Sequence, residues 1–125
     1  PAFNLQRAVS TAIRNRKHDY YTGVVYTTTK RVWEYDERFK KYLEKSRAMA
    51  IDMETATIFV VGHHNEISRG ALLLVSDVPL TPEGVKTEES DIRVTERWSD
   101  IHLQIGIEAM TEIGEKGEKI KHFMY

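Results

Sequence analysis

The apolar positions of the chain recur mostly with the period of an amphipathic helix. The first such stretch covers residues 3–16, where the apolar side is formed by Leu5, Ala8, Val9, Ala12 and Ile13. A second covers residues 36–45 and begins at Asp36, a residue type that caps helices well. A third covers residues 94–113, and its stripe consists of Val94, Trp98, Ile101, Ile105 and Ala109. The pattern therefore predicts an amphipathic helix in each stretch.

Other stretches have the composition of β-strands. Residues 20–28 are rich in Tyr, Val and Thr, and residues 49–51 form a short apolar segment. Residues 71–75, Ala-Leu-Leu-Leu-Val, are continuously apolar, as in a strand buried on both faces of a parallel sheet. Residues 53–64 between the last two segments predict a helix that is apolar nearly all round. We therefore expect an α/β fold with a mainly parallel or mixed sheet flanked by helices.

Acidic residues follow two of these predicted strands. Asp52 and Glu54 come after residues 49–51, and Asp77 comes after residues 71–75. In open α/β sheets ligands bind outside the carboxyl ends of the strands, and an acid near buried surface is costly unless it is paired. One alternative is that Asp52 is an N-cap and Glu54 a charge favoured at a helix N-terminus. Capping does not explain a further carboxylate from the next strand. We therefore expect a site at the carboxyl ends of these strands, the rim of the sheet.

These acids stand in a sequence pattern that resembles a known superfamily. Asp52-Met53-Glu54-Thr55-Ala56, followed 23 residues after Glu54 by Asp77 in a Ser-Asp pair, resembles the nucleoside phosphorylases and nucleosidases. Their members carry an acidic-Met-Glu-x-Ala motif for the sugar and a Ser-Asp motif for the base. The flanking residues 47–51, 75–80 and 102–109 are closest to the AMP nucleosidases of this superfamily. The resemblance covers residues 21–109.

The resemblance implies roles for individual residues. Glu54 would accept hydrogen bonds from the ribose hydroxyls, and Met53 would lie against the sugar face. Asp77, beside Ser76, would protonate or hydrogen-bond the purine at N7. Trp33 precedes the Met-Glu motif by nearly the family interval and would stack on the purine. The structural alternatives are that Trp33 covers the edge of the core and that Asp77 caps the turn after its strand.

Further polar residues are less specific. In the phosphorylases an arginine pairs with the matching aspartate at a shorter interval than Asp77 to Arg93, so Arg93 or Lys86 replaces it, or neither does. The hydroxyls of residues 27–29 follow the first strand, where they either touch a ligand or only end the strand. Adjacent His63 and His64 diverge by about 100° on a helix, so we expect no metal site.

Composition limits the class of protein. The 125 residues, 41% hydrophobic and 30% charged, fit one globular domain. The chain begins with Pro1 and lacks the Gly-rich N-terminal half of the family. We interpret residues 1–125 as a single partial domain, the C-terminal half of a nucleoside phosphorylase-like domain, with a fraying tail at 114–125. A net charge of −1, no long apolar run and no cysteine predict a cytoplasmic protein that binds neither nucleic acid nor membrane.

The function that the resemblance implies is hydrolysis of the N-glycosidic bond of AMP to adenine and ribose 5-phosphate, without a cofactor and in a homo-oligomer. Such cleavage passes through a sugar with oxocarbenium character, and the leaving base needs a proton. One alternative is a purine nucleoside phosphorylase or another purine nucleosidase. An alternative of a different class is an inactive domain that binds nucleotide or directs assembly.

Overall fold

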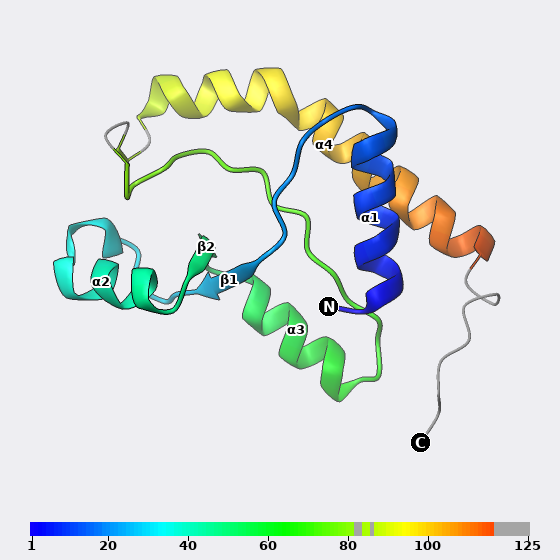
Figure 1. The fold of residues 1–125 in the computed structure, drawn as a ribbon, viewed down its shortest axis with the longest axis horizontal. Helices are drawn as coiled ribbons and strands as arrows, with labels where there is room; N and C mark the ends of the chain where they lie inside the picture. Colours follow the sequence, from blue (N-terminus) through cyan, green and yellow to red (C-terminus); the bar gives the residue numbers. More distant parts are fainter. Residues whose placement is uncertain (82–83, 86, 117–125) are drawn as a thin grey trace.

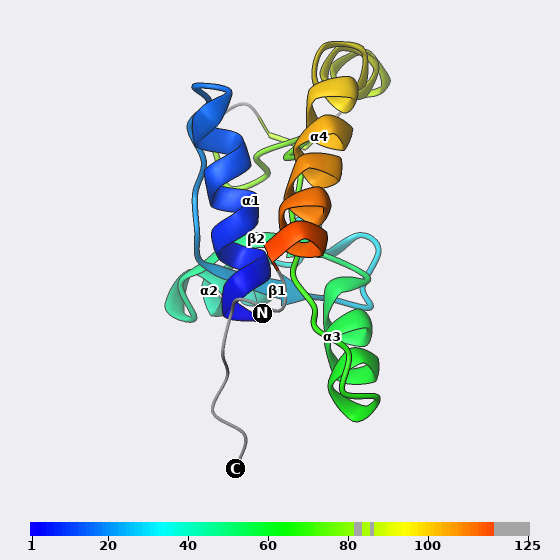
Figure 2. The same cartoon turned by 90° about the vertical axis from the view of Figure 1, so that its right-hand side faces the viewer.

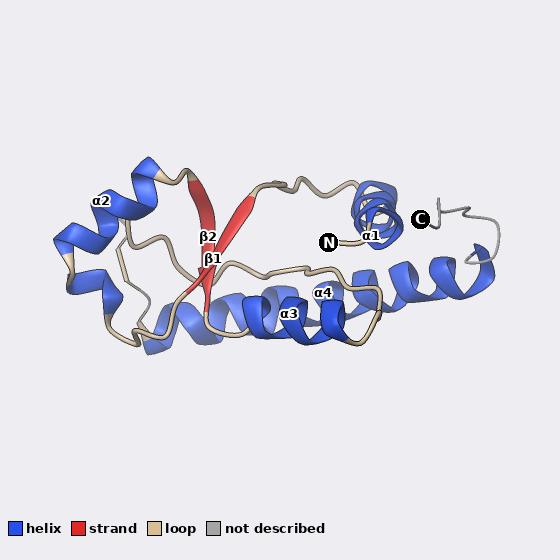
Figure 3. Ribbon diagram, turned by 90° about the horizontal axis from the view of Figure 1, so that it is seen from below, coloured by secondary structure: helices blue, strands red, loops and turns tan. Residues whose placement is uncertain are grey.

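The computed structural model describes residues 1–81, 84–85 and 87–116 of the chain. Along the sequence the elements are α1 (Phe3–Asn15), β1 (Val24–Thr27), the 3₁₀ helix η1 (Trp33–Tyr35), α2 (Glu37–Lys45), β2 (Ala48–Asp52), α3 (Thr55–His64) and α4 (Glu88–Lys116). Helices α1 and α4 lie side by side (Figures 1 and 2), and α2 lies on the other side of the strands from α1 (Figures 1 and 3). The predicted α/β class with helices flanking a parallel sheet is confirmed.

The sheet is formed by β1 and β2, which run parallel. Val25 pairs with Ala50, Tyr26 with Ile51 and Thr27 with Asp52, after a register shift between Val24 and Val25. The connection between the strands contains η1 and α2, as expected for a crossover between parallel strands. This register brings the carboxyl ends of both strands together at Thr27 and Asp52.

The predicted third strand at residues 71–75 is wrong. In the described part of the chain this segment pairs with neither β1 nor β2. Leu73, Leu74 and Val75 are 38%, 39% and 57% exposed, so the segment is not buried on both faces. A continuous apolar run reports a tendency to be buried, but a strand also needs a neighbour with free backbone groups to bond.

The core between α1 and α4 confirms the apolar stripes of both helices. It is formed by Ala12, Ile13 and Ile105, with Val9, Leu72 and Ile101 packed against it. Across the edge of this core, Nε of Arg16 donates to a carboxylate oxygen of Glu108 at 3.2 Å, and Nη2 donates to the other oxygen. The helix pair is therefore joined by apolar packing and by a bidentate ion pair.

The start of α4 lies earlier than the predicted residue 94. Thr87 and Ser90 form a reciprocal cap, in which the Ser90 amide donates to Thr87 Oγ1 at 3.2 Å and the Thr87 amide donates to Ser90 Oγ at 2.9 Å. The acids of the first turn, Glu88, Glu89 and Asp91, suit the positive end of the helix dipole. The helix continues through residues 114–116, where fraying was expected, and residues 117–125 lie outside the described residues.

Replacing Thr87 with alanine is expected to lower the free energy of unfolding by about 1 kcal/mol, because amides of the first turn lose their capping partner. Urea denaturation of the variant and the parent protein measures this difference. Thr95→Ala, at an exposed position inside α4, is the control and should be neutral or slightly stabilising. Equal losses in the two variants would contradict the capping role.

Candidate functional site

Asp52 lies at the carboxyl end of β2 and connects both strands to α3. Its Oδ1 accepts a hydrogen bond from the Thr27 hydroxyl at 2.6 Å, and its Oδ2 accepts from the Thr55 amide at 2.7 Å and from the Thr55 hydroxyl. The Ala56 amide in turn donates to Thr27 Oγ1 at 2.9 Å. Asp52 therefore caps the start of α3, as the structural alternative predicted. Asp52 also accepts a hydrogen bond from Thr27 on β1, a contact that this alternative did not include.

The same contacts change the acidity of Asp52. Burial raises the pKa of Asp52, but the hydrogen bonds from the Thr27 and Thr55 hydroxyls and from the Thr55 and Glu54 amides outweigh it, so the pKa lies below its ordinary value of 3.8. A carboxyl whose folded pKa is depressed stabilises the fold above its unfolded pKa. That stability is lost as the pH falls through the folded pKa.

We therefore expect the free energy of unfolding to differ between the parent and Asp52→Asn by a constant amount above about pH 5. The difference should shrink as the pH falls below the unfolded pKa, because the parent then loses a stabilising charge that the variant lacks. Denaturant titrations at a series of pH values test this. A difference that grows on acidification would contradict the direction of the pKa shift.

Met53 and Glu54 form the turn between β2 and α3. Met53 is 44% exposed, and its amide donates to Glu54 Oε2 at 3.2 Å. Glu54 is also exposed and makes no side-chain cap to α3. Asp52 supplies the cap, so the carboxylate of Glu54 stays exposed at the rim of the sheet, with Oε2 bonded to the Met53 amide.

Ser76 and Asp77 follow the extended apolar segment and are both half-buried. The Ser76 hydroxyl donates to Asp77 Oδ1 at 2.8 Å. A serine hydroxyl that donates to the aspartate fixes the direction of one carboxylate oxygen.

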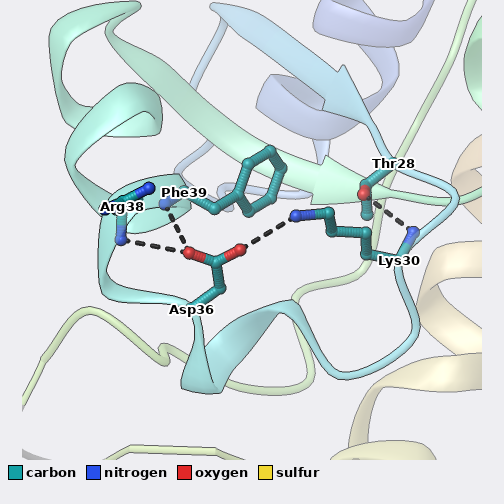
Figure 4. Close-up of polar contacts among 5 residues, drawn as sticks. All are labelled: Thr28, Lys30, Asp36, Arg38 and Phe39. Carbon is teal, nitrogen blue, oxygen red and sulfur yellow. Dashed lines mark hydrogen bonds and ion pairs between the residues drawn. The ribbon is translucent and has the colours of Figure 1, made fainter.

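The loop with Trp33 is tied to α2 (Figure 4). Nζ of Lys30 pairs with Asp36 Oδ2 at 2.9 Å and lies 5.3 Å from the centre of the Phe39 ring. Asp36 also accepts from the amides of Arg38 and Phe39, which confirms the predicted cap of α2. Trp33 meets the Phe39 ring edge-on, with 6.1 Å between ring centres. This contact is what the structural alternative for Trp33 expected, and stacking on a purine stays a prediction.

Arg93, Lys86 and the histidines complete the set of residues considered from the sequence. Arg93 is exposed within the second turn of α4, and Lys86 lies outside the described residues. His63 contacts Arg69, with Nδ1 and Nη2 3.1 Å apart, near the C-terminus of α3. Among the residues that the structure describes, no three His, Cys, Asp or Glu side chains are grouped as metal ligands would be.

Three cavities in the described part of the chain lie away from Trp33, Glu54 and Asp77. A volume of about 740 Å³ lies between the strands, residues 71–75, α1 and α4, and its lining is largely apolar. The other two cavities are lined mainly by residues of α4 and by residues 63–69. The structure thus brings Asp52, Met53 and Glu54 together at one rim but does not close the whole predicted set into one pocket.

Thr27 is the residue of this rim that the sequence did not single out. Its hydroxyl was one of a run of strand-end hydroxyls with two possible meanings. Because the parallel register pairs Thr27 with Asp52, it is the hydroxyl of Thr27 that meets the carboxylate of Asp52. The sequence carries no signal for that register.

Comparison with known proteins identifies the class. The family model described as "Phosphorylase superfamily" matches residues 1–111, so the chain belongs to the phosphorylase superfamily.

Within the part described by the structure, no helix is long and apolar enough to cross a membrane.

Individual relatives point to one group within that class. The chain is 41% identical over 101 residues to the AMP nucleosidases of Escherichia coli strain K12 and of Escherichia coli O157:H7; the match covers 79% of this chain and 20% of theirs. The crystal structure of AMP nucleosidase from Bacteroides thetaiotaomicron is similar at a TM-score of 0.75 and 43% identity, covering 94% of this chain and 43% of that one. The chain thus spans about a fifth of the length of the curated relatives and is a homologue of AMP nucleosidases.

Proposed function

We propose that the full protein to which this chain belongs hydrolyses AMP to adenine and ribose 5-phosphate. The observation that carries the proposal is the Asp52-Met53-Glu54 turn at the carboxyl ends of two parallel strands, in a chain 41–43% identical to AMP nucleosidases. This rim is where ligands bind in open α/β sheets. The exposure of Met53 and Glu54 supports a role in contacting substrate.

The reaction breaks the bond between N9 of adenine and C1′ of the ribose and forms a bond from C1′ to the oxygen of water. Positive charge develops on the sugar, the departing base takes up a proton, and the attacking water loses one as its oxygen bonds to C1′. We assign the proton donation, or a hydrogen bond at N7, to Asp77. Glu54 would accept hydrogen bonds from the ribose hydroxyls, Met53 would lie against the sugar, and Ser76 would orient Asp77.

Other substrate contacts are part of the proposal. Trp33 would stack on the purine, and such stacking contributes roughly 1–3 kcal/mol per base. Arg93 or Lys86 would pair with Asp77 as the reaction proceeds. We also propose that the full protein self-associates, for which the exposed apolar residues of α3 offer a surface.

Assays of the full-length protein with AMP, adenosine and inosine, each with and without phosphate, test this proposal. Release of adenine from AMP in the absence of phosphate supports it. Base release that needs phosphate, or that prefers adenosine or inosine, would instead support a purine nucleoside phosphorylase or another nucleosidase. Tight binding of AMP without turnover would support a nucleotide-binding or assembly domain.

A further inference from the structure

The N-terminus of α3 is held by polar contacts more than by burial. The helix is apolar, yet Ile58, Val60 and Val61 are 57%, 68% and 54% exposed in the described part of the chain. At the start of the helix, the described part of the chain supplies hydrogen-bond acceptors for the first amides of α3. The position of the Met53-Glu54 turn therefore depends on the groups that accept from those amides.

Two of the first amides of α3 are bound from two different strands. The Thr55 amide donates to Asp52 on β2, and the Ala56 amide donates to the Thr27 hydroxyl on β1. The first amides of a helix have no partner within the helix, so such acceptors decide where it begins. Thr27 belongs to neither the turn nor the helix, and it ties both to the neighbouring strand.

The Thr27 hydroxyl also has a second bond, which it donates to Asp52 Oδ1. One hydroxyl thus fills its donor role toward the capping carboxylate and an acceptor role toward the helix. The Thr28 amide donates to the Asp52 carbonyl at 2.9 Å, so backbone pairing and side-chain pairing reinforce each other at this point. A valine at position 27 would keep the shape of the side chain and lose both of its hydrogen bonds.

We infer that Thr27 is a positioning residue, which acts on substrate cleavage by fixing the Glu54 turn against the end of β1. The inference rests on the proposed function of Glu54 as the acceptor of ribose hydrogen bonds. A displacement of about 1 Å in a group that positions substrate can cost 10²-fold in rate. Thr27 would exert its effect without touching substrate itself.

Steady-state kinetics of the full-length protein on AMP test this inference. Thr27→Val should lower kcat/KM by roughly 10- to 100-fold, whereas Thr27→Ser, which keeps the hydroxyl, should stay within about threefold of the parent. Thr111→Val is the matched control, because that hydroxyl donates only within α4, to the Ile107 carbonyl, and its loss should leave kcat/KM unchanged. If Thr27→Val does not fold, Thr27→Cys, with a weakly bonding thiol, should fall between the serine variant and the expected valine loss.

A double-mutant cycle separates positioning from a general loss of stability. In a Glu54→Gln background Thr27→Val should cost little more, because its effect passes through Glu54. An equal cost in both backgrounds, or Thr27→Val kinetics within about twofold of the parent, would overturn the inference.

Amide hydrogen exchange distinguishes failure of this inference from failure of the proposed function. If the parent does not cleave AMP, the proposed function fails, and the inferred role in AMP cleavage fails with it. Faster exchange of the Thr55 and Ala56 amides in Thr27→Val, with Thr111→Val unchanged, would still show that Thr27 holds the turn. If the parent cleaves AMP but Thr27→Val leaves both exchange and kinetics unchanged, the inference alone is wrong.

Discussion

Asp77→Asn in the full-length protein should lower kcat for AMP cleavage by roughly 10²- to 10⁴-fold, the range that general acid catalysis supplies. Asparagine has nearly the same shape as aspartate but has no acidic proton to give to the purine. The Ser76 hydroxyl, which donates to Oδ1 of Asp77, can donate to the amide oxygen of the variant in the same way. Folding and part of the substrate binding should therefore be retained while turnover is lost.

Initial rates at saturating AMP, with thermal denaturation to confirm folding, measure this effect. Asp100→Asn is the control, since Asp100 is exposed on α4 and the same chemical change there should leave kcat unaltered. If Asp77 only caps the turn after the extended segment, asparagine keeps that bond and activity persists. A variant with more than about a tenth of the parent kcat would contradict the role as general acid.

Glu54→Gln is the second large expected effect, a fall in kcat/KM of roughly 10- to 100-fold. A hydrogen bond to a charged acceptor contributes about 1.5–3 kcal/mol, and about 1.4 kcal/mol corresponds to a factor of ten. The bonds from the ribose hydroxyls should strengthen as positive charge develops on the sugar, so kcat should fall as well as kcat/KM.

Rates over a range of AMP concentrations separate the two constants for Glu54→Gln. Glu96→Gln, at an exposed position of α4, is the matched control and should behave as the parent. If Glu54 serves only as a charge near the N-terminus of α3, its replacement changes stability slightly and leaves kcat/KM intact. That outcome would remove Glu54 from the proposed site.

The sequence predicted the parts of the fold that depend on local patterns. The stripes that place Ile13 and Ile105 in one core follow from helical periodicity, and the cap of α2 follows from Asp36 alone. Thr87 followed by Glu88 and Glu89 is likewise a pattern typical of a helix start, since threonine caps helices and acids favour the first turn. The sequence is therefore sufficient to predict elements that depend on neighbours only a few residues away.

Features that depend on distant partners were not predictable in the same way. Residues 71–75 are apolar enough for a buried strand, but whether they form one depends on a neighbour that hydrogen-bonds to them. At the rim, the motif indicated Asp52, Met53 and Glu54, while the contact of Thr27 with Asp52 follows from the parallel register between two strands 20 or more residues apart. Whether Lys86, Arg93 or neither pairs with Asp77 stays a prediction, and Lys86 lies outside the described residues.

We propose that the full protein adds water, not phosphate, to C1′ of AMP. The most direct test is to incubate the full-length protein with AMP in phosphate-free buffer made with H₂¹⁸O and to analyse the products by mass spectrometry. We expect adenine together with ribose 5-phosphate that carries one heavy oxygen from the water added at C1′. Intact AMP under these conditions would contradict the addition of water, as would adenine release that begins only when phosphate is added and yields ribose 1,5-bisphosphate.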